Sequence, residues 1–134
     1  MAKLSKATLD NFKVMKQAYA LDDIVPGTKL SEGAYYVMTE GEALGLISAI
    51  AHAQAAENAD FQIWRLTVHA DKSADLSCKD RHGRVTCTKS FKKVDFSLPE
   101  IVLCVAKPVG GSEFMIMLPR EANNYYGDKL APLD

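Results

Sequence analysis

The chain has 134 residues, of which 48% are hydrophobic and 25% are charged, and its formal net charge is -1. These values are ordinary for a folded domain that buries its own core, so they exclude a globally disordered chain. A net charge this small also excludes a whole-molecule electric field that would draw the protein to nucleic acid or to a membrane.

Targeting signals and cysteine content indicate the compartment. The first residues contain lysines but no apolar region, so they do not form a secretory signal. The longest apolar stretch, residues 43–56, is interrupted by polar side chains and is too short to span a membrane. Three cysteines favour reduced thiols over a disulfide framework. We therefore expect a cytoplasmic protein that does not bind membranes.

The first predicted element is an amphipathic helix over residues 5–21. Ser5 is a suitable N-cap. Apolar residues follow at helical spacing, namely Leu9, Phe12, Met15 and Tyr19. Such a stripe predicts a face that docks onto the rest of the domain. Proline and glycine then indicate a loop over residues 22–33.

A strand is predicted at residues 34–38, where strand-forming side chains are frequent. It runs directly into Thr39 and Glu42, which have the spacing of a capping box, so a helix is expected over residues 40–58. That helix is small or apolar on nearly every face, which is typical of a buried helix. We therefore interpret it as the central helix of the domain.

The strongest predicted strand covers residues 61–70. Trp64 and Leu66 are expected to point into the core. A polar stripe occupies the opposite face, consisting of Arg65, Thr67 and His69. If this strand lies next to the one at 34–38, the connecting helix makes the two strands parallel with a right-handed crossover.

Short strands dominate the second half of the chain. Two hairpins and a tail are expected, with strands at 76–80, 85–89, 100–109 and 112–118 and the tail from about 121 to 134. The sum is a single α+β domain over residues 1–134. Its one sheet has about five or six mostly antiparallel strands, packed with the central buried helix and the N-terminal amphipathic helix.

The first hairpin contains two cysteines and a charged turn. A two-residue turn at His82 and Gly83 places Cys78 opposite Cys87 and Arg81 opposite Arg84. In that register Val85 shares the apolar face with the cysteines. Zinc knuckles separate their cysteines by two to four residues, whereas eight residues intervene here, so no metal or other cofactor is predicted. A disulfide is sterically possible, but the expected compartment favours reduced cysteines that fill the core.

The charge of residues 79–93, which we call the basic segment, is the most specialised feature. It carries +5, because only Asp80 opposes six cations, namely Lys79, Arg81, Arg84, Lys89, Lys92 and Lys93. Such an asymmetry indicates an anionic partner. The facing arginines would repel each other unless an anion lies between them. The alternative is a solvated hairpin whose lysines only prevent edge-to-edge association.

Catalytic motifs are not found in the sequence. The chain has no nucleophile elbow, no phosphate-binding loop and no dinucleotide-binding glycine pattern, so no catalytic residue is predicted. His52 lies on the apolar helix and is expected to be hydrogen-bonded there. His69 shares its stripe with two other polar residues, and this stripe is either an open binding face or an internal polar contact.

Three hypotheses for function follow. The first is a non-enzymatic interaction protein, of the inhibitor or accessory-factor type, that binds another protein through its charged surface. The second is nucleic-acid or nucleotide binding by the basic hairpin. The third is a small enzyme centred on His69. The candidate binding residues are Lys79, Arg81, His82, Arg84, Lys89, Lys92, Lys93, Arg65 and His69.

Overall fold

The computed structural model describes residues 18–41, 43–56, 60–94, 96, 98–107 and 113–126, with side chains up to residue 122 in the last stretch. Most of the predicted N-terminal helix, residues 5–17, lies outside this range. Its last residues are not helical: strand β1 (Ala18–Ala20) pairs antiparallel with β2 (Thr28–Ser31). The prediction of helix was wrong there, because the β2 strand offers backbone partners that a helical periodicity does not reveal.

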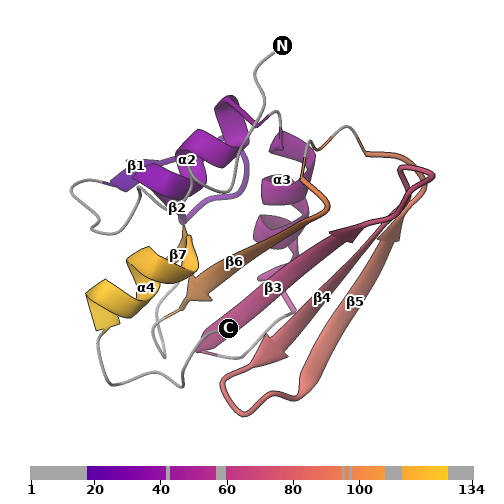
Figure 1. Cartoon of the computed structure of the whole chain (residues 1–134). Helices are drawn as coiled ribbons and strands as arrows, with labels where there is room; N and C mark the ends of the chain where they lie inside the picture. Colours follow the sequence, from indigo (N-terminus) through magenta and orange to yellow (C-terminus); the bar gives the residue numbers. More distant parts are fainter. Residues whose placement is uncertain are drawn as a thin grey trace.

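The described residues form one mixed sheet of seven strands and three helices, an α+β arrangement (Figure 1). Five longer or central strands follow β2: β3 (Phe61–Val68), β4 (Ala74–Asp80), β5 (Val85–Phe91), β6 (Glu100–Ala106) and β7 (Phe114–Met117). Their order across the sheet is β1-β2-β7-β6-β3-β4-β5. Every neighbouring pair is antiparallel except β2 and β7. The sheet has more strands than the expected five or six, because β1 and β2 were not predicted. Both strands are short and flank a proline-glycine loop.

Residues 34–38, expected as a strand, belong instead to helix α2 (Glu32–Thr39). Ser31 caps this helix, with its hydroxyl oxygen accepting a bond from the backbone N–H of Ala34 at 3.1 Å. The Thr39 hydroxyl donates back to the Tyr35 carbonyl, so Thr39 ends α2 instead of capping the next helix. Capping and burial of one helix face therefore override the strand propensity of the tyrosines.

The expected parallel β-α-β unit is absent as a consequence. Strand β3 lies between β4 and β6, and two strands separate it from β2. The strand itself is confirmed over Phe61–Val68, with Trp64 and Leu66 buried as expected.

The central helix is shorter than residues 40–58 and is buried on one side only. It is α3 (Leu44–Ala53), whose buried residues are Leu46, Ile47, Ile50 and Ala51. Leu44 is 56% exposed at its first turn. Ala43 occupies the N-cap position, and no described side chain caps the helix there. His52 is exposed, and its Nδ1 lies 2.8 Å from the Ser48 carbonyl oxygen.

The helices cover the two faces of the sheet unequally. Helices α2 and α3 pack on one face over the main core around Trp64 and Leu76. On the opposite face, α4 (Pro119–Tyr126) places Ala122 in a small cluster with Phe61 and Met117. No described helix covers that face over β4 and β5 (Figure 1). We call the side of β3, β4 and β5 that points away from α2 and α3 the outer face.

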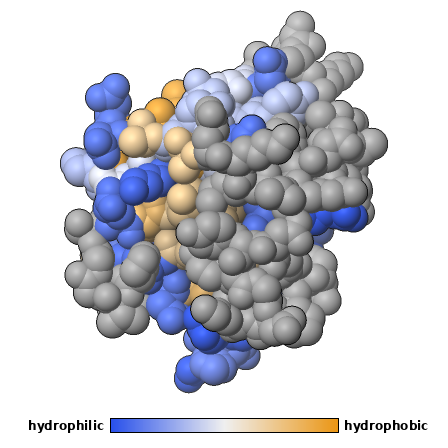
Figure 2. Space-filling view, turned by 90° about the vertical axis from the view of Figure 1, so that its left-hand side faces the viewer, coloured by the Kyte–Doolittle hydropathy of each residue, from blue (hydrophilic) through white to orange (hydrophobic). Residues whose placement is uncertain are grey.

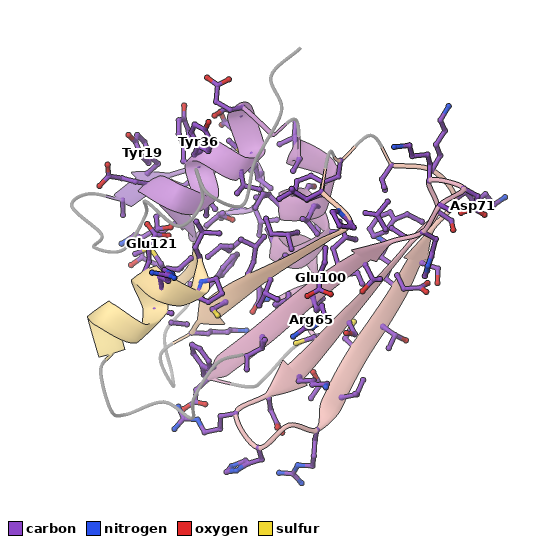
Figure 3. All side chains as sticks on the ribbon, viewed as in Figure 1. Tyr19, Tyr36, Arg65, Asp71, Glu100 and Glu121 are labelled. Atoms are coloured by element: carbon purple, nitrogen blue, oxygen red, sulfur yellow. The ribbon has the colours of Figure 1, made fainter. Side chains whose placement is uncertain are left out.

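One buried carboxylate connects both helical layers. The side chain of Glu121, at the start of α4, is fully buried. Its Oε1 accepts bonds from the Ser31 hydroxyl at 2.6 Å and from the Leu118 N–H at 2.9 Å, and its Oε2 accepts one from the Gly33 N–H at 3.0 Å. Figure 3 shows Glu121 between α4 and the start of α2. The carboxylate therefore satisfies N–H groups at the beginning of two helices.

A second buried polar network fixes α3 against the sheet. The side-chain amides of Gln54 and Gln62 bond each other reciprocally at 2.7 and 2.8 Å. The indole N–H of Trp64 donates to the Gln62 Oε1 at 2.9 Å. Across the described residues, every buried side-chain nitrogen and oxygen has a partner.

On the side of the molecule near β1 and α2, the described residues that are visible in Figure 2 are largely hydrophilic and surround a strip of apolar surface. Tyr19 of β1 stacks on Tyr35 of α2, with ring centroids 4.1 Å apart. The two rings brace the short edge strand against the helix. None of the described helices is long and apolar enough to cross a membrane.

Candidate interaction surface

The β4–β5 hairpin turns through three residues, not the two expected. The N–H of Asp80 donates to the Arg84 carbonyl, and the N–H of Gly83 donates to the Asp80 carbonyl, both at 3.0 Å. Gly83 has a φ of 83°, which glycine adopts without strain. Cys78 faces Cys87 as predicted, but the register then shifts so that Lys79 faces Val85. The hairpin is thus a three-residue loop with a bulge, a common alternative to the two-residue turn.

The bulge changes which face two residues occupy. Val85 moves to the outer face, where it is 58% exposed, instead of joining the cysteines on the core side. Arg81 and Arg84 no longer face each other. Their guanidinium groups contact Asp60 at 3.1 Å and Asp80 at 3.3 Å, respectively. The expected repulsive pair is therefore absent, and each arginine of the turn has a carboxylate beside it.

Asp80 organises this turn. Its Oδ1 accepts bonds from the backbone N–H groups of His82 at 2.9 Å and Arg84 at 3.0 Å. The N–H of Arg84, followed by that of His82, holds the pKa of the Asp80 carboxyl below its usual value of 3.8. The carboxylate is consequently charged at neutral pH and fixes the loop conformation.

The two cysteines of the hairpin face each other across β4 and β5, as predicted. Cys78 is buried, Cys87 is half-buried on the same core-facing side, and neither forms a disulfide. Burial raises the pKa of the Cys104 thiol to about 12. Among the residues that the structure describes, no group of three histidine, cysteine, aspartate or glutamate side chains could hold a metal ion.

The outer face carries charges of both signs. Arg65 forms an ion pair with Glu100 of the neighbouring strand β6, and the side chains are 40% and 47% exposed. Figure 3 shows this pair in the middle of the sheet, with both side chains on the same side. Thr67 is half-buried beside it, and Lys79 is exposed on β4. Among the described residues, no element covers Arg65 and Thr67 of β3, and both are accessible to solvent. This agrees with the first of the two alternatives for the stripe, an open face, and not with an internal polar contact.

His69 lies past the end of β3, in the turn that leads to β4. Its Nε2 is 2.9 Å from the Asp75 Oδ2, and the Ser90 hydroxyl donates to the Asp75 Oδ1 at 3.0 Å. The pKa of the Asp75 carboxyl lies below its usual value, mainly because of the hydrogen bond with His69 and, second, because of the one from Ser90. The carboxylate sits between the histidine and the serine, so the histidine does not contact the hydroxyl as a general base would.

The basic segment divides into two groups of residues. Arg81, His82 and Arg84 lie at the turn of the hairpin. Lys89, Lys92 and Lys93 lie at or beyond the other end of β5, which rises about 3.3 Å per residue and so extends roughly 20 Å. The Nζ of Lys89 lies 5.5 Å from the centroid of the Phe91 ring. With Lys79 on β4, the six cations of the predicted +5 patch are therefore spread along the length of the hairpin and are not gathered at its turn.

A pocket lies beside this second group. It has a volume of about 220 Å³ and is lined by Ala43, Gly45, Leu46, Leu66, Phe91, Lys93, Val94 and Phe96. The sequence reasoning missed it. Phe91 continues the alternation of Cys87 and Lys89 on the core-facing side of β5, which could have identified it, but no local pattern announces Phe96. Asp60, the partner of Arg81, was missed for the same reason.

The fold and this surface define a small α+β protein with an exposed hairpin and a charged outer face. A sequence model of one protein family matches residues 3–122, and the chain therefore belongs to the family of unknown function DUF6876. No curated protein and no solved structure matches the chain significantly.

Proposed function

We propose that the protein is a small non-enzymatic interaction protein, of the inhibitor or accessory-factor type, that binds a partner protein through the exposed β4–β5 hairpin. The observation that carries this proposal is that β5 contributes few side chains to the core. It is a seven-residue strand at the edge of the sheet, with its bulge confined to the end next to the turn, yet only Cys87 and Phe91 are half-buried and its other side chains are exposed. A strand that contributes so little to the core is well suited to contact another molecule.

The free edge of β5 supports binding by strand addition. Among the described strands β5 pairs only with β4, so the backbone groups on its other side face outward. Proteins usually protect a long exposed edge, because it pairs readily with other chains. Here the edge carries a single lysine, Lys89, along seven residues. An extended partner segment that pairs with β5 would satisfy those backbone groups.

The charges favour a protein partner over nucleic acid. The two turn arginines each contact an aspartate, and Arg65 contacts Glu100. Mixed charges of this kind suit a complementary protein surface. Nucleic-acid binding without sequence preference also uses exposed aromatic rings for base stacking. The outer face of the described β4 and β5 residues carries no aromatic side chain.

The test uses the double variant Arg81→Ala/Arg84→Ala in affinity capture from the native host, followed by binding measurements with the purified captured protein. We expect at least a tenfold loss of affinity with a nearly unchanged melting temperature, because exposed ion pairs contribute little stability. The matched control is Lys29→Ala, which removes another exposed ion pair, with Glu113, on the distant strand β2.

Three outcomes would contradict the proposal. Equal losses for the hairpin variant and the control would show that the hairpin is not the binding surface. A large drop in the melting temperature of the double variant would assign the turn to folding instead. Strongly salt-dependent binding to an oligonucleotide, lost in the double variant, would favour the nucleic-acid alternative.

A further inference from the structure

The pocket at the end of β5 has an apolar interior and a cationic border. Leu46 and Leu66 belong to the main core, and Phe91, Val94 and Phe96 complete the walls. Lys93 is the only charged residue among the described lining residues. Lys89 lies over the ring of Phe91, so a second ammonium group is close to the same wall. A ligand that fits this site has an apolar body and a negative charge at its edge.

One further feature adds positive potential at this end of the molecule. Helix α3 begins at the pocket, with Gly45 of its first turn in the lining and no side-chain cap among the described residues. Its first N–H groups therefore add to the positive charge of the lysines. The Val94 N–H donates to the backbone carbonyl of Lys72 at 2.8 Å, which brings the β3–β4 turn to the same end. Lys72 and Asp71 of that turn carry opposite charges and add no net potential.

The size of the pocket decides the kind of ligand. Sites for whole small molecules measure about 300–1,000 Å³. This pocket, at about 220 Å³, is smaller. Single buried aromatic or aliphatic side chains, inserted into well-packed pockets, contribute most of the affinity of many protein interfaces. A pocket of this size is suited to one such anchor.

We propose that this pocket binds one large apolar side chain of an acidic segment in the partner protein, with the carboxylates of that segment beside Lys89 and Lys93. This inference rests on the proposed function and specifies the partner. The pocket opens at the Phe91 end of the same strand whose edge is free. A segment paired with β5 would lie about 4.8 Å from it and could reach the pocket at that end.

The first experiment measures the chemistry of the pocket in the full chain by amide NMR titration. The probes are N-acetyltryptophan, which carries a carboxylate, and its neutral amide. We expect shift changes at Leu46, Phe91, Val94 and Phe96, with the acid binding about threefold more tightly than the amide. Lys93→Glu should reverse that preference. Absence of shifts at these residues, or equal binding of the acid and the amide, would overturn the proposal.

A second arm distinguishes a partner segment from a free small acid. The probe is a capped hexapeptide with one central tryptophan flanked by aspartates. Tighter binding of this peptide than of N-acetyltryptophan supports the proposed occupant, whereas weaker binding assigns the pocket to a free apolar acid and overturns it. Replacing the tryptophan with alanine in the peptide should abolish binding.

Gly45→Leu adds a bulky side chain to the lining of the pocket, and the fold should tolerate it, because a Cβ at this position meets nothing within 4 Å. We expect it to remove binding of both probes and to weaken the captured partner at least tenfold. If Gly45→Leu leaves the partner bound while Arg81→Ala/Arg84→Ala releases it, the pocket inference fails and the proposed function stands. If neither variant affects the partner, the proposed function fails.

Discussion

At the scale of single residues, the contact between Gly33 and Glu121 is a tight steric constraint. A Cβ on Gly33 would lie 2.5 Å from the Glu121 Oε1 and 2.5 Å from the Leu118 Cδ1. The carboxylate approaches that closely because it accepts the N–H of Gly33 itself. Only glycine at the first turn of α2 therefore allows the buried bond to form.

We predict that Gly33→Ala destabilises the protein by about 1–3 kcal/mol, because the added methyl group must displace Glu121 or Leu118. Urea unfolding followed by circular dichroism measures the change. The matched control is Gly45→Ala, also in the first turn of a helix but open to solvent. It should stabilise the protein by about 0.5–1 kcal/mol, since alanine favours the helix. Equal effects at the two glycines would show that the close approach is not a constraint.

The thiols should differ in reactivity. Cys78 and Cys104 are fully buried, and burial raises the pKa of Cys104 to about 12, so the reactive thiolate of this residue is scarce at neutral pH. Cys87 is only half-buried. We predict that maleimide labels one thiol in the folded protein and three in urea, measured by intact mass. Cys87→Ser should remove the label of the folded protein. Rapid labelling of two or three thiols without urea would contradict the described packing.

At the scale of elements, the β4–β5 turn should show its dependence on Asp80 as the pH falls. The pKa of this carboxyl is lowered on folding, so its contribution to stability is present above the unfolded pKa. That contribution is lost as the pH falls through the lower folded pKa. An NMR titration should give an Asp80 midpoint below 3.8.

The variant Arg84→Ala separates the causes of this shift. It keeps the backbone N–H of residue 84, which is the main cause, and removes only the guanidinium group. The Asp80 midpoint should therefore stay below 3.8 in the variant. A midpoint at or above 3.8 in the unmodified protein would show that the carboxylate does not hold the turn.

Elements with strong local patterns were predictable from sequence. The alternation along β3, the pairing of Cys78 with Cys87 and the buried character of β6 all follow from side-chain spacing. The helix at Glu32–Thr39 was missed because its stability comes from Ser31 and from a carboxylate about ninety positions away. The bulge was missed because Gly83 alone is compatible with a two-residue or a three-residue loop. The hydrogen bonds of the Asp80 side chain select the three-residue loop. In both places a tertiary or side-chain contact decided between two locally acceptable conformations.

At the scale of the whole molecule, stability should fall from the middle of the sheet toward β5. Strands β3 and β6 have neighbours on both sides, whereas β5 has one neighbour and little buried surface. We predict that amides of β3 and β6 exchange with deuterium slower than those of β5 by roughly a hundredfold or more. Mass-spectrometric exchange measures this, and binding of the captured partner should slow exchange in β5 selectively. Uniform protection across the sheet would contradict an exposed edge.

The parallel pairing of β2 with β7 has a consequence for folding during synthesis. Residues 28–30 of β2 cannot pair with β7 until residues 114–116 have left the ribosome. Helix α2 lacks the Glu121 carboxylate until five more residues have emerged. The antiparallel strands β3 to β6 are complete earlier in the emerging chain. The segment from β1 to α2 is thus synthesised before β3 to β6 but stabilised after them. A nascent chain would keep the apolar residues of this segment, Leu30 and Val37 among them, accessible to chaperones until nearly the whole matched family region has emerged.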